Sequence, residues 1–389
     1  MDAGQSGTGR MRDPGTPARR ASRLTAVTTE PTSEALALAG AWTALLDGLA
    51  ASGAAVADGV TDPVELAEGY RFVTRLLSAS LDMTLENGDP VRPGFTRLMT
   101  DTRKFFGDNP DTAYDYAPLK GAVRYLVEGT RGSCHYLSFC VYGPDPTGAN
   151  RIVASINDED LTIDADGRFR LVLSIDPAPS ELAGDWLPTA PEVDSLVVRQ
   201  YFLDRDAEIE ATYAISPLDD PGPPKPPSPE RVARRLRGVA AFTQIGTELS
   251  AGFAASLEAG EPNTFSVNSA DRAAAFYPTP DNVYVAGWYR LEPGEALEIT
   301  GRPPEGRYWS VLLMSRWMES LDYRHHRIIL NQRDAVLEPD GTFRILVADR
   351  DPGVPNWLDT AGHRQGYVMF RWLRSEAERP ACRVVRLDG

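Results

Sequence analysis

The amino-acid sequence predicts a mostly β protein of the α+β class, made of two duplicated antiparallel β-sandwich halves with N-terminal helices and a connecting helix. Three observations lead to this fold class. The same strand and turn signals occur twice in the same order, a proline-rich segment separates the two copies, and helical periodicity is confined to the segments before each copy. At 389 residues the chain is long enough for two or three such units.

The helical segments come first. Residues 1–32 are rich in Gly, Pro and Arg and are predicted to be a disordered tail without the apolar core of a secretory signal. Residues 33–104 are predicted to be mainly helical, because apolar residues recur at helical spacing from residue 33 onward. A second helix is expected to begin at Asp62, which is followed by proline and, three residues later, by Glu65.

Short alternating or apolar runs, broken by Gly, Pro and Asp, then predict the strands. They define a first β-sandwich half at 105–216 and a second at 261–389. Residues 217–229 are too rich in proline to form a helix or a central strand, so they are predicted to be an exposed linker. Residues 230–260 have the pattern of a long amphipathic helix.

The duplication is visible in shared landmarks. The first half contains Asn109-Pro110-Asp111, then Asp166-Gly167, then Asp185-Trp186; the second contains Pro280-Asp281-Asn282, then Asp340-Gly341, then Asn356-Trp357. An Asp-Gly pair between alternating apolar residues is typical of a hairpin turn, because glycine adopts positive φ without strain. Two copies of one sandwich are the simplest interpretation.

Three segments, FFGDNPDTAYDYAPL, HYLSF and NWLDTAGHRQGYVMFRW, resemble the bacterial domain-of-unknown-function family 1214. The resemblance is most specific over residues 278–372. The upstream half also resembles family 1254, the frequent companion of family 1214. The resemblance implies a helix-plus-jelly-roll-like β-sandwich architecture. It implies no activity, because the family is named for having none assigned.

Composition excludes several partners and compartments. The formal net charge of −15 argues against a nucleic-acid partner or an anionic membrane surface, both of which need a basic face. The sequence also has no run of eighteen uninterrupted apolar residues, so no membrane span is expected. Three cysteines without a CxxC pair favour a reducing, cytoplasmic location.

The motifs of several enzyme classes are missing. The sequence has no HExxH or HxH pair for a metal, and no Walker A loop, GxSxG elbow or GxGxxG fingerprint. Only four histidines occur in the whole chain. We therefore expect no metal and no cofactor.

Five residues are candidates for catalysis by acid–base chemistry. Asp111 or Asp359 could act as the base, His363 as acid or base, and Tyr114 and Arg371 as groups that orient substrate or stabilise an anion. A simpler interpretation is available for several of them. Asp111 follows an Asn-Pro pair that also favours a plain turn, and His363 could be an ordinary loop histidine.

A further group is predicted to contact substrate. Aromatic residues gather in the second half, where they could stack on sugar rings, cover an apolar ligand or simply fill the core. Charged residues interleaved with them would need partners if buried. The predicted binding residues are Arg103, Asn109, Tyr284, Trp317, Asp322, Asn356 and Trp357.

Three functions remain open at this point. The first is a cofactor-independent hydrolase, lyase or isomerase with a small-molecule substrate in a cleft between the halves. The second is a protein that binds a glycan or an apolar metabolite. The third is an assembly protein whose sandwiches form a homo-oligomer. Titratable groups converging in one enclosed pocket would favour the enzyme, exposed coplanar tryptophans the glycan-binding protein, and large apolar outer patches the assembly protein.

Overall fold

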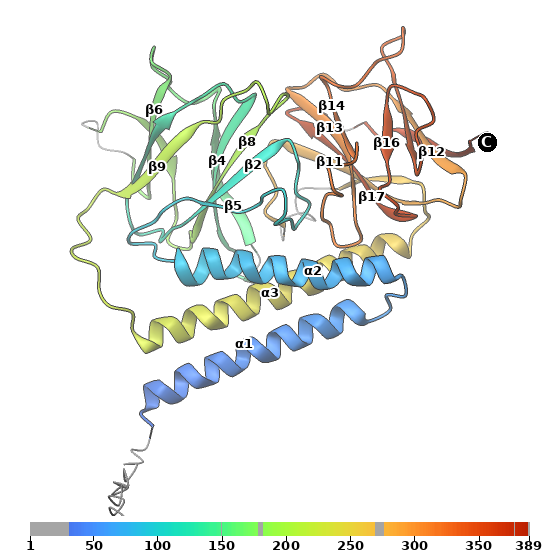
Figure 1. Ribbon diagram of the computed structural model, residues 1–389. Coiled ribbons are helices and arrows are strands. Elements are labelled where there is room, and N and C mark those ends of the chain that lie inside the picture. The colour runs from blue at the N-terminus through green and yellow to red at the C-terminus, as the bar shows by residue number, and fades with distance from the viewer. Residues whose placement is uncertain (1–30, 149, 178–181, 269–275, 377, 388–389) are drawn as a thin grey trace, which may run out of the picture.

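Two similar β-sandwich halves stand side by side on a layer of helices in the computed structural model of the protein (Figure 1). The structure describes residues 31–387 apart from 149, 178–181, 269–275 and 377. Each half has a five-stranded and a four-stranded sheet, so the predicted mostly β, duplicated fold class is confirmed. Most of the predicted tail at 1–32 lies outside the described residues.

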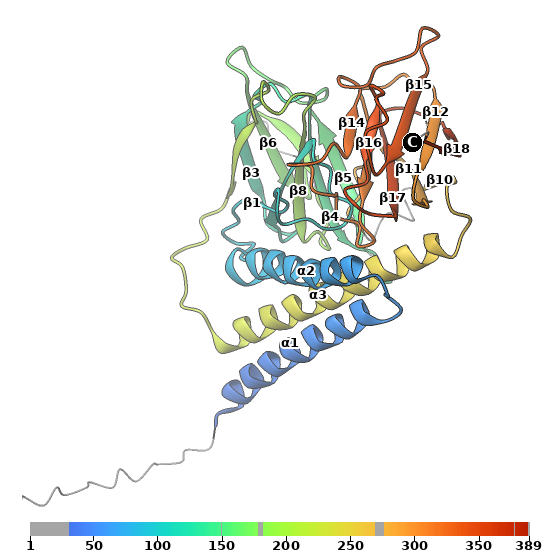
Figure 2. The ribbon, with the colours of Figure 1, turned by 45° about the vertical axis from the view of Figure 1, so that its right-hand side comes forward.

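Three helices form the layer below both halves, with α1 outermost (Figures 1 and 2). They are α1 (Ser33–Ala57), α2 (Pro63–Ser80) and α3 (Pro229–Glu258). A short π-helix, η1 (Leu81–Glu86), continues α2. The side chain of Asp62 accepts hydrogen bonds from the amides of Val64 and Glu65, as expected of an N-cap before Pro63.

The outermost helix packs on the long helix between the halves. Ala41 and Leu45 of α1 share a buried apolar cluster with Leu236 and Val239 of α3. Among the described helices, α1 alone is long and apolar enough to cross a membrane, by length and composition only.

The strands of the first half form two sheets. The larger has the order β1 (Thr96–Arg97), β2 (Thr112–Pro118), β8 (Ser195–Tyr201), β4 (Tyr136–Pro144), β5 (Asn150–Asn157); the smaller has the order β7 (Asp185–Pro188), β6 (Arg168–Ser174), β3 (Tyr125–Thr130), β9 (Thr212–Pro217).

The second half repeats this order strand for strand. Its larger sheet is β10 (Phe265–Asn268), β11 (Asn282–Arg290), β17 (Gln365–Leu373), β13 (Tyr308–Met314), β14 (Ile329–Asn331); its smaller sheet is β16 (Trp357–Asp359), β15 (Phe343–Ala348), β12 (Glu295–Gly301), β18 (Ala381–Arg386). The pairing is antiparallel except for one parallel pair in each half, β6 with β7 and β15 with β16. The presence of this parallel pair at the same place in both halves supports their origin by duplication.

Each half has its own core between its two sheets. In the second half, Trp309, Phe343, Phe370 and Trp372 stack on one another with ring centroids 5.2 to 5.8 Å apart. All four side chains are buried. Core filling therefore accounts for most of the aromatic residues in this half.

The two halves contact each other reciprocally through the same pair of residue types. The carboxylate of Asp111 accepts a 2.7 Å hydrogen bond from Tyr308 of the second half, and Asp281 accepts a 2.5 Å bond from Tyr136 of the first half. Asn331 and Asn157, at equivalent positions, add an amide donor to each carboxylate. Such an exchange of equivalent residues is the pattern of a two-fold symmetric interface within one chain.

Two helical glycines provide a stability test of the helix layer. A Cβ added at Gly69 in α2 would lie 2.5 Å from both the Trp317 indole and the Val56 side chain, whereas one at Gly40 in α1 would meet nothing within 4 Å. We expect Gly69→Ala to lower the free energy of unfolding by about 1–3 kcal/mol through overpacking. Gly40→Ala should raise it by about 0.5–1 kcal/mol. Urea denaturation measures both, and equal effects of the two changes would contradict this packing.

Candidate functional site

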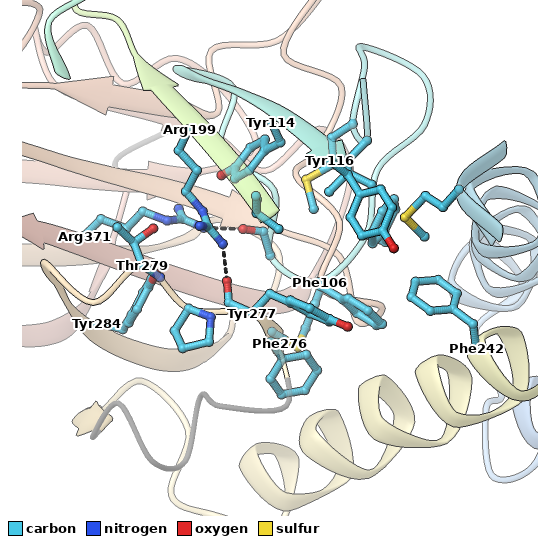
Figure 3. A pocket seen from close by; sticks show the side chains of 18 of the residues that line it. Phe106, Tyr114, Tyr116, Arg199, Phe242, Phe276, Tyr277, Thr279, Tyr284 and Arg371 are labelled. Carbon is cyan, nitrogen blue, oxygen red and sulfur yellow. Dashed lines mark hydrogen bonds between the residues drawn. The ribbon is translucent and has the colours of Figure 1, made fainter. Parts of the chain in front are cut away.

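A cavity of about 270 Å³ lies where the two halves meet the helix layer. Both larger sheets, the helix layer and two loops contribute to its wall (Figure 3). Residues that line it include Met83, Tyr114, Tyr116, Val197 and Arg199 from the first part of the chain, Phe242 and Phe253 from α3, Tyr284, Met369 and Arg371 from the second half, and Phe106, Gly107, Phe276 and Tyr277 from the loops.

Two arginines mark the polar end of the cavity, and they occupy equivalent positions. Arg199 on β8 pairs in register with Tyr114 on β2, and Arg371 on β17 pairs in register with Tyr284 on β11. Each arginine is only 3% exposed. Each guanidinium also lies within 5.9 Å of the ring centre of its paired tyrosine.

The arginines hold the loops of the opposite half. Arg199 donates to the backbone carbonyl of Tyr277, and Arg371 donates to the backbone carbonyl of Gly107. Both carbonyls follow backbone with positive φ, since Phe106, Gly107 and Tyr277 have φ values of 51°, 74° and 52°. Arg199 also donates a 2.9 Å hydrogen bond to the Tyr142 hydroxyl. The loops turn sharply enough to present carbonyls to the buried guanidiniums.

The paired tyrosines contribute hydroxyl groups. The Tyr114 hydroxyl accepts a hydrogen bond from the amide of Asn109, and the Tyr284 hydroxyl accepts one from the amide of Thr279. Burial raises the pKa of Tyr114, although the nearby charges of Arg371 and Arg199 act in the opposite direction. The phenol therefore keeps its proton at neutral pH and can donate it in a hydrogen bond.

The opposite end of the cavity is apolar and aromatic. Phe106 contacts Phe242 with ring centroids 5.8 Å apart and Phe276 at 5.6 Å, and Phe253 contacts Phe276 at 5.7 Å. These rings come from α3 and from the loops before β2 and β11 (Figure 3). The cavity thus has one cationic, hydrogen-bonding end and one hydrophobic end.

Three of the residues predicted from the sequence line this cavity: Tyr114, Tyr284 and Arg371. Asp111 and Asn109 lie instead in the contact between the halves. Asn109 donates hydrogen bonds to Thr112 and Tyr308. Burial raises the pKa of Asp111 to about 6, although its hydrogen bonds from Tyr308 and Asn331 act to lower it.

Asp359 and His363 lie away from the cavity, each in a separate polar contact. Asp359 accepts a 2.7 Å hydrogen bond from His326. The His363 ring contacts the Glu68 carboxylate of α2 at 3.0 Å. Burial acts to lower the pKa of His363, but Glu68 raises it above its ordinary value. The candidates Asp111, Asp359, His363 and Arg371 therefore do not converge on one cavity.

The other predicted binding residues have structural contacts outside the cavity. Arg103 joins Asp82 of η1 to the carbonyl of Leu98, and the Trp317 indole donates to the Glu65 carbonyl of α2. Three more lie in the second half, where Asp322 pairs with Arg324, Asn356 bonds to backbone atoms of Val336 and Arg344, and Trp357 donates to the Ala348 carbonyl.

Sequence reasoning missed Arg199 and the aromatic end of the cavity. Arg199 could have been found from the duplication, because aligning Tyr114 with Tyr284 places LVVRQ opposite VMFRW, with an arginine at the fourth position of each. Phe106 and Phe276 precede the matching turns by the same number of residues. Phe242 has no such signal, because it lies on α3 and the repeated strand pattern does not give the position of that helix.

Within the part of the chain that the structure describes, no group of three or more His, Cys, Asp or Glu side chains could hold a metal ion. The prediction that no metal or cofactor is bound stays a prediction.

Comparisons with known proteins identify relatives. A family model described as "Protein of unknown function (DUF1214)" matches residues 110–202 and again 289–377, so both halves match one family. A crystal structure of an uncharacterised protein from Burkholderia cenocepacia is 34% identical, with a TM-score of 0.86 over 91% of this chain and 99% of that one. The VPA0106 protein from Vibrio parahaemolyticus is 14% identical, with a TM-score of 0.47 over 82% and 98%. No protein with a curated description matches the chain.

The half-buried Asp111 makes a pH-dependent contribution to stability. Its pKa is about 6 in the folded protein and near the ordinary 3.8 when unfolded, so the folded state holds the proton more tightly. As pH rises from about 4 to 6, the unfolded state ionises first and the wild-type protein loses stability. We expect the stability of Asp111→Asn relative to wild type to rise over this range by about 2–3 kcal/mol and to level off above it. Chemical denaturation across pH measures the difference, and a constant difference would contradict the assignment.

Proposed function

Because the chain belongs to the DUF1214 family, whose name assigns no activity, we propose its function from the cavity: the protein binds a small, largely apolar molecule between its two halves. The composition of the cavity wall supports this proposal most strongly. Aromatic and methionine side chains dominate it, and a few polar groups gather at one end. This distribution is typical of small-molecule sites, in which apolar walls supply affinity and sparse polar groups fix orientation.

The absence of an acid–base pair in the wall favours binding over hydrolysis or elimination. None of the described residues that line the cavity is Asp, Glu, His or Cys. Tyrosine and arginine remain, and the raised pKa of Tyr114 makes its phenol a hydrogen-bond donor rather than a base.

A cofactor-independent enzyme is the second candidate. Its support is the position of the Tyr114 phenol, next to Arg199 and Arg371 at the polar end of the cavity. A protonated phenol beside two cations could donate a proton or a hydrogen bond to a developing oxyanion. A lyase or isomerase reaction would suit this arrangement better than hydrolysis, because none of the described residues in the wall is a base that could activate water.

Glycan binding has less support. Trp288, Trp309, Trp317 and Trp372 are buried, so they form no exposed stacking platform. We also propose three properties from the sequence. They are a cytoplasmic location, a homo-oligomer and a relation of the first half to family 1254.

A substitution that narrows the cavity tests the binding proposal. Phe242 of α3 faces the cavity, whereas Ile245 of the same helix is 54% exposed. A panel of octyl and phenyl compounds would be screened against the wild-type protein by ligand-observed NMR. We expect Phe242→Trp to weaken the affinity of the best probe by at least about tenfold, because the larger ring takes space from the ligand.

The matched control is Ile245→Trp, which adds the same indole on the solvent side and should leave the affinity unchanged. Two results would contradict the proposal. One is that no compound of the panel binds the wild-type protein. The other is that both variants weaken binding equally.

A further inference from the structure

We infer that the ligand of this cavity is an apolar carboxylic acid and that Arg199 and Arg371 together bind its carboxylate. The inference rests on the proposed binding function and adds the chemical class of the ligand. Both guanidiniums belong to the same end of the cavity, with Tyr114 and Tyr284 beside them, while the phenylalanine rings occupy the other end (Figure 3).

The positive charges of Arg199 and Arg371 are not compensated by acidic side chains among the described residues. Both arginines are 3% exposed, and neither forms an ion pair with an acidic side chain among the described residues. Their hydrogen bonds go to backbone carbonyls and to one tyrosine hydroxyl, all of them neutral. Two buried cations near each other are costly unless an anion compensates them. An anionic ligand would supply that compensation.

The polar end of the cavity also has hydrogen-bond donors without an acceptor among the described residues. The Nη1 atom of Arg371 is buried and has no hydrogen-bond partner among the residues that the structure describes. The hydroxyls of Tyr114 and Tyr284 accept hydrogen bonds from backbone amides, and neither donates one to a described residue. Arg371 Nη1 and the two phenol protons are thus available to one acceptor. A carboxylate accepts several hydrogen bonds on its two oxygens.

Asp108, which follows Gly107 in the sequence, does not accept a hydrogen bond from these donors. Asp108 directly follows Gly107, whose carbonyl accepts from Arg371. Its carboxylate accepts instead from the Ser320 amide at 2.8 Å and the Ser320 hydroxyl at 2.6 Å. Asp108 is not among the residues that line the cavity. Among the described residues, the polar end therefore has donors but no acidic acceptor.

The apolar end decides between a carboxylic acid and an inorganic anion. The rings of Phe106, Phe242 and Phe276 would gain nothing from a fully hydrated ion, whereas an alkyl or aryl chain would remove them from water. The modest volume of 270 Å³ suits a medium-length chain or a single aromatic ring rather than a long lipid.

A matched pair of probes tests the inference. Octanoate and octanol have the same chain length and differ in head-group charge. Isothermal titration calorimetry on the wild-type protein should give at least about tenfold tighter binding of octanoate, the size expected of a charge-assisted pair. Arg371→Gln should lose this preference while still binding octanol. Arg383→Gln, which removes an exposed arginine of β18, should keep it.

The outcomes separate the two proposals. Equal binding of octanoate and octanol would overturn the carboxylate inference and leave the apolar site standing. Failure of both probes, and of the phenyl pair benzoate and benzyl alcohol, would overturn the binding function itself. Tighter binding of octyl phosphate than of octanoate would overturn the carboxylate assignment in favour of a phosphate. The wild-type comparison needs no variant, so it stands even if Arg371→Gln fails to fold.

Discussion

The buried contact between the two halves is the constraint on which the rest of the structure depends. Each half supplies one carboxylate, Asp111 or Asp281, and one phenol, Tyr308 or Tyr136, to its counterpart. A carboxylate without donors at this depth would be costly, so the contact holds only when both sheets are in register. The loops that carry the two aspartates also carry the carbonyls of Gly107 and Tyr277. The same contact therefore sets the shape of the cavity.

The sequence predicts the fold well, because each signal that it uses is local. These signals are the side-chain N-cap at Asp62, the Asp-Gly turns at 166–167 and 340–341 and the repeated order of strands. Each depends on a few neighbouring residues, and the structure contains all of them. The parallel pairs β6 with β7 and β15 with β16 were not predicted. Parallel pairing is a long-range choice that alternating apolar residues do not specify.

The candidate site is less predictable, because its residues are far apart in sequence and only their burial and orientation make them a site. Asp359 and His363 have suitable chemistry for catalysis, yet each contacts a partner outside the cavity, His326 and Glu68 respectively. The sequence draws attention to Arg371 because Trp372 follows it, whereas no tryptophan flanks its equivalent Arg199. Aligning the sequences of the two halves identifies Arg199 and Arg371 as a pair. The contribution of Phe242 can be recognised only from the position of α3 in the structure.

Because the two halves belong to one chain, equivalent positions can carry different residues. In a dimer of identical halves, equivalent positions would carry the same residue. In such a dimer any change in the cavity would occur twice, and the cavity would accept only what suits both sides. Here the equivalent of Tyr116 is Ala286 and the equivalent of Tyr142 is Met314, as the strand registers show. Tyr142 binds Arg199, and Met314 offers Arg371 no such hydroxyl. The two arginines thus occupy equivalent positions but differ in how firmly each is held, which would give a molecule bound as proposed a defined direction.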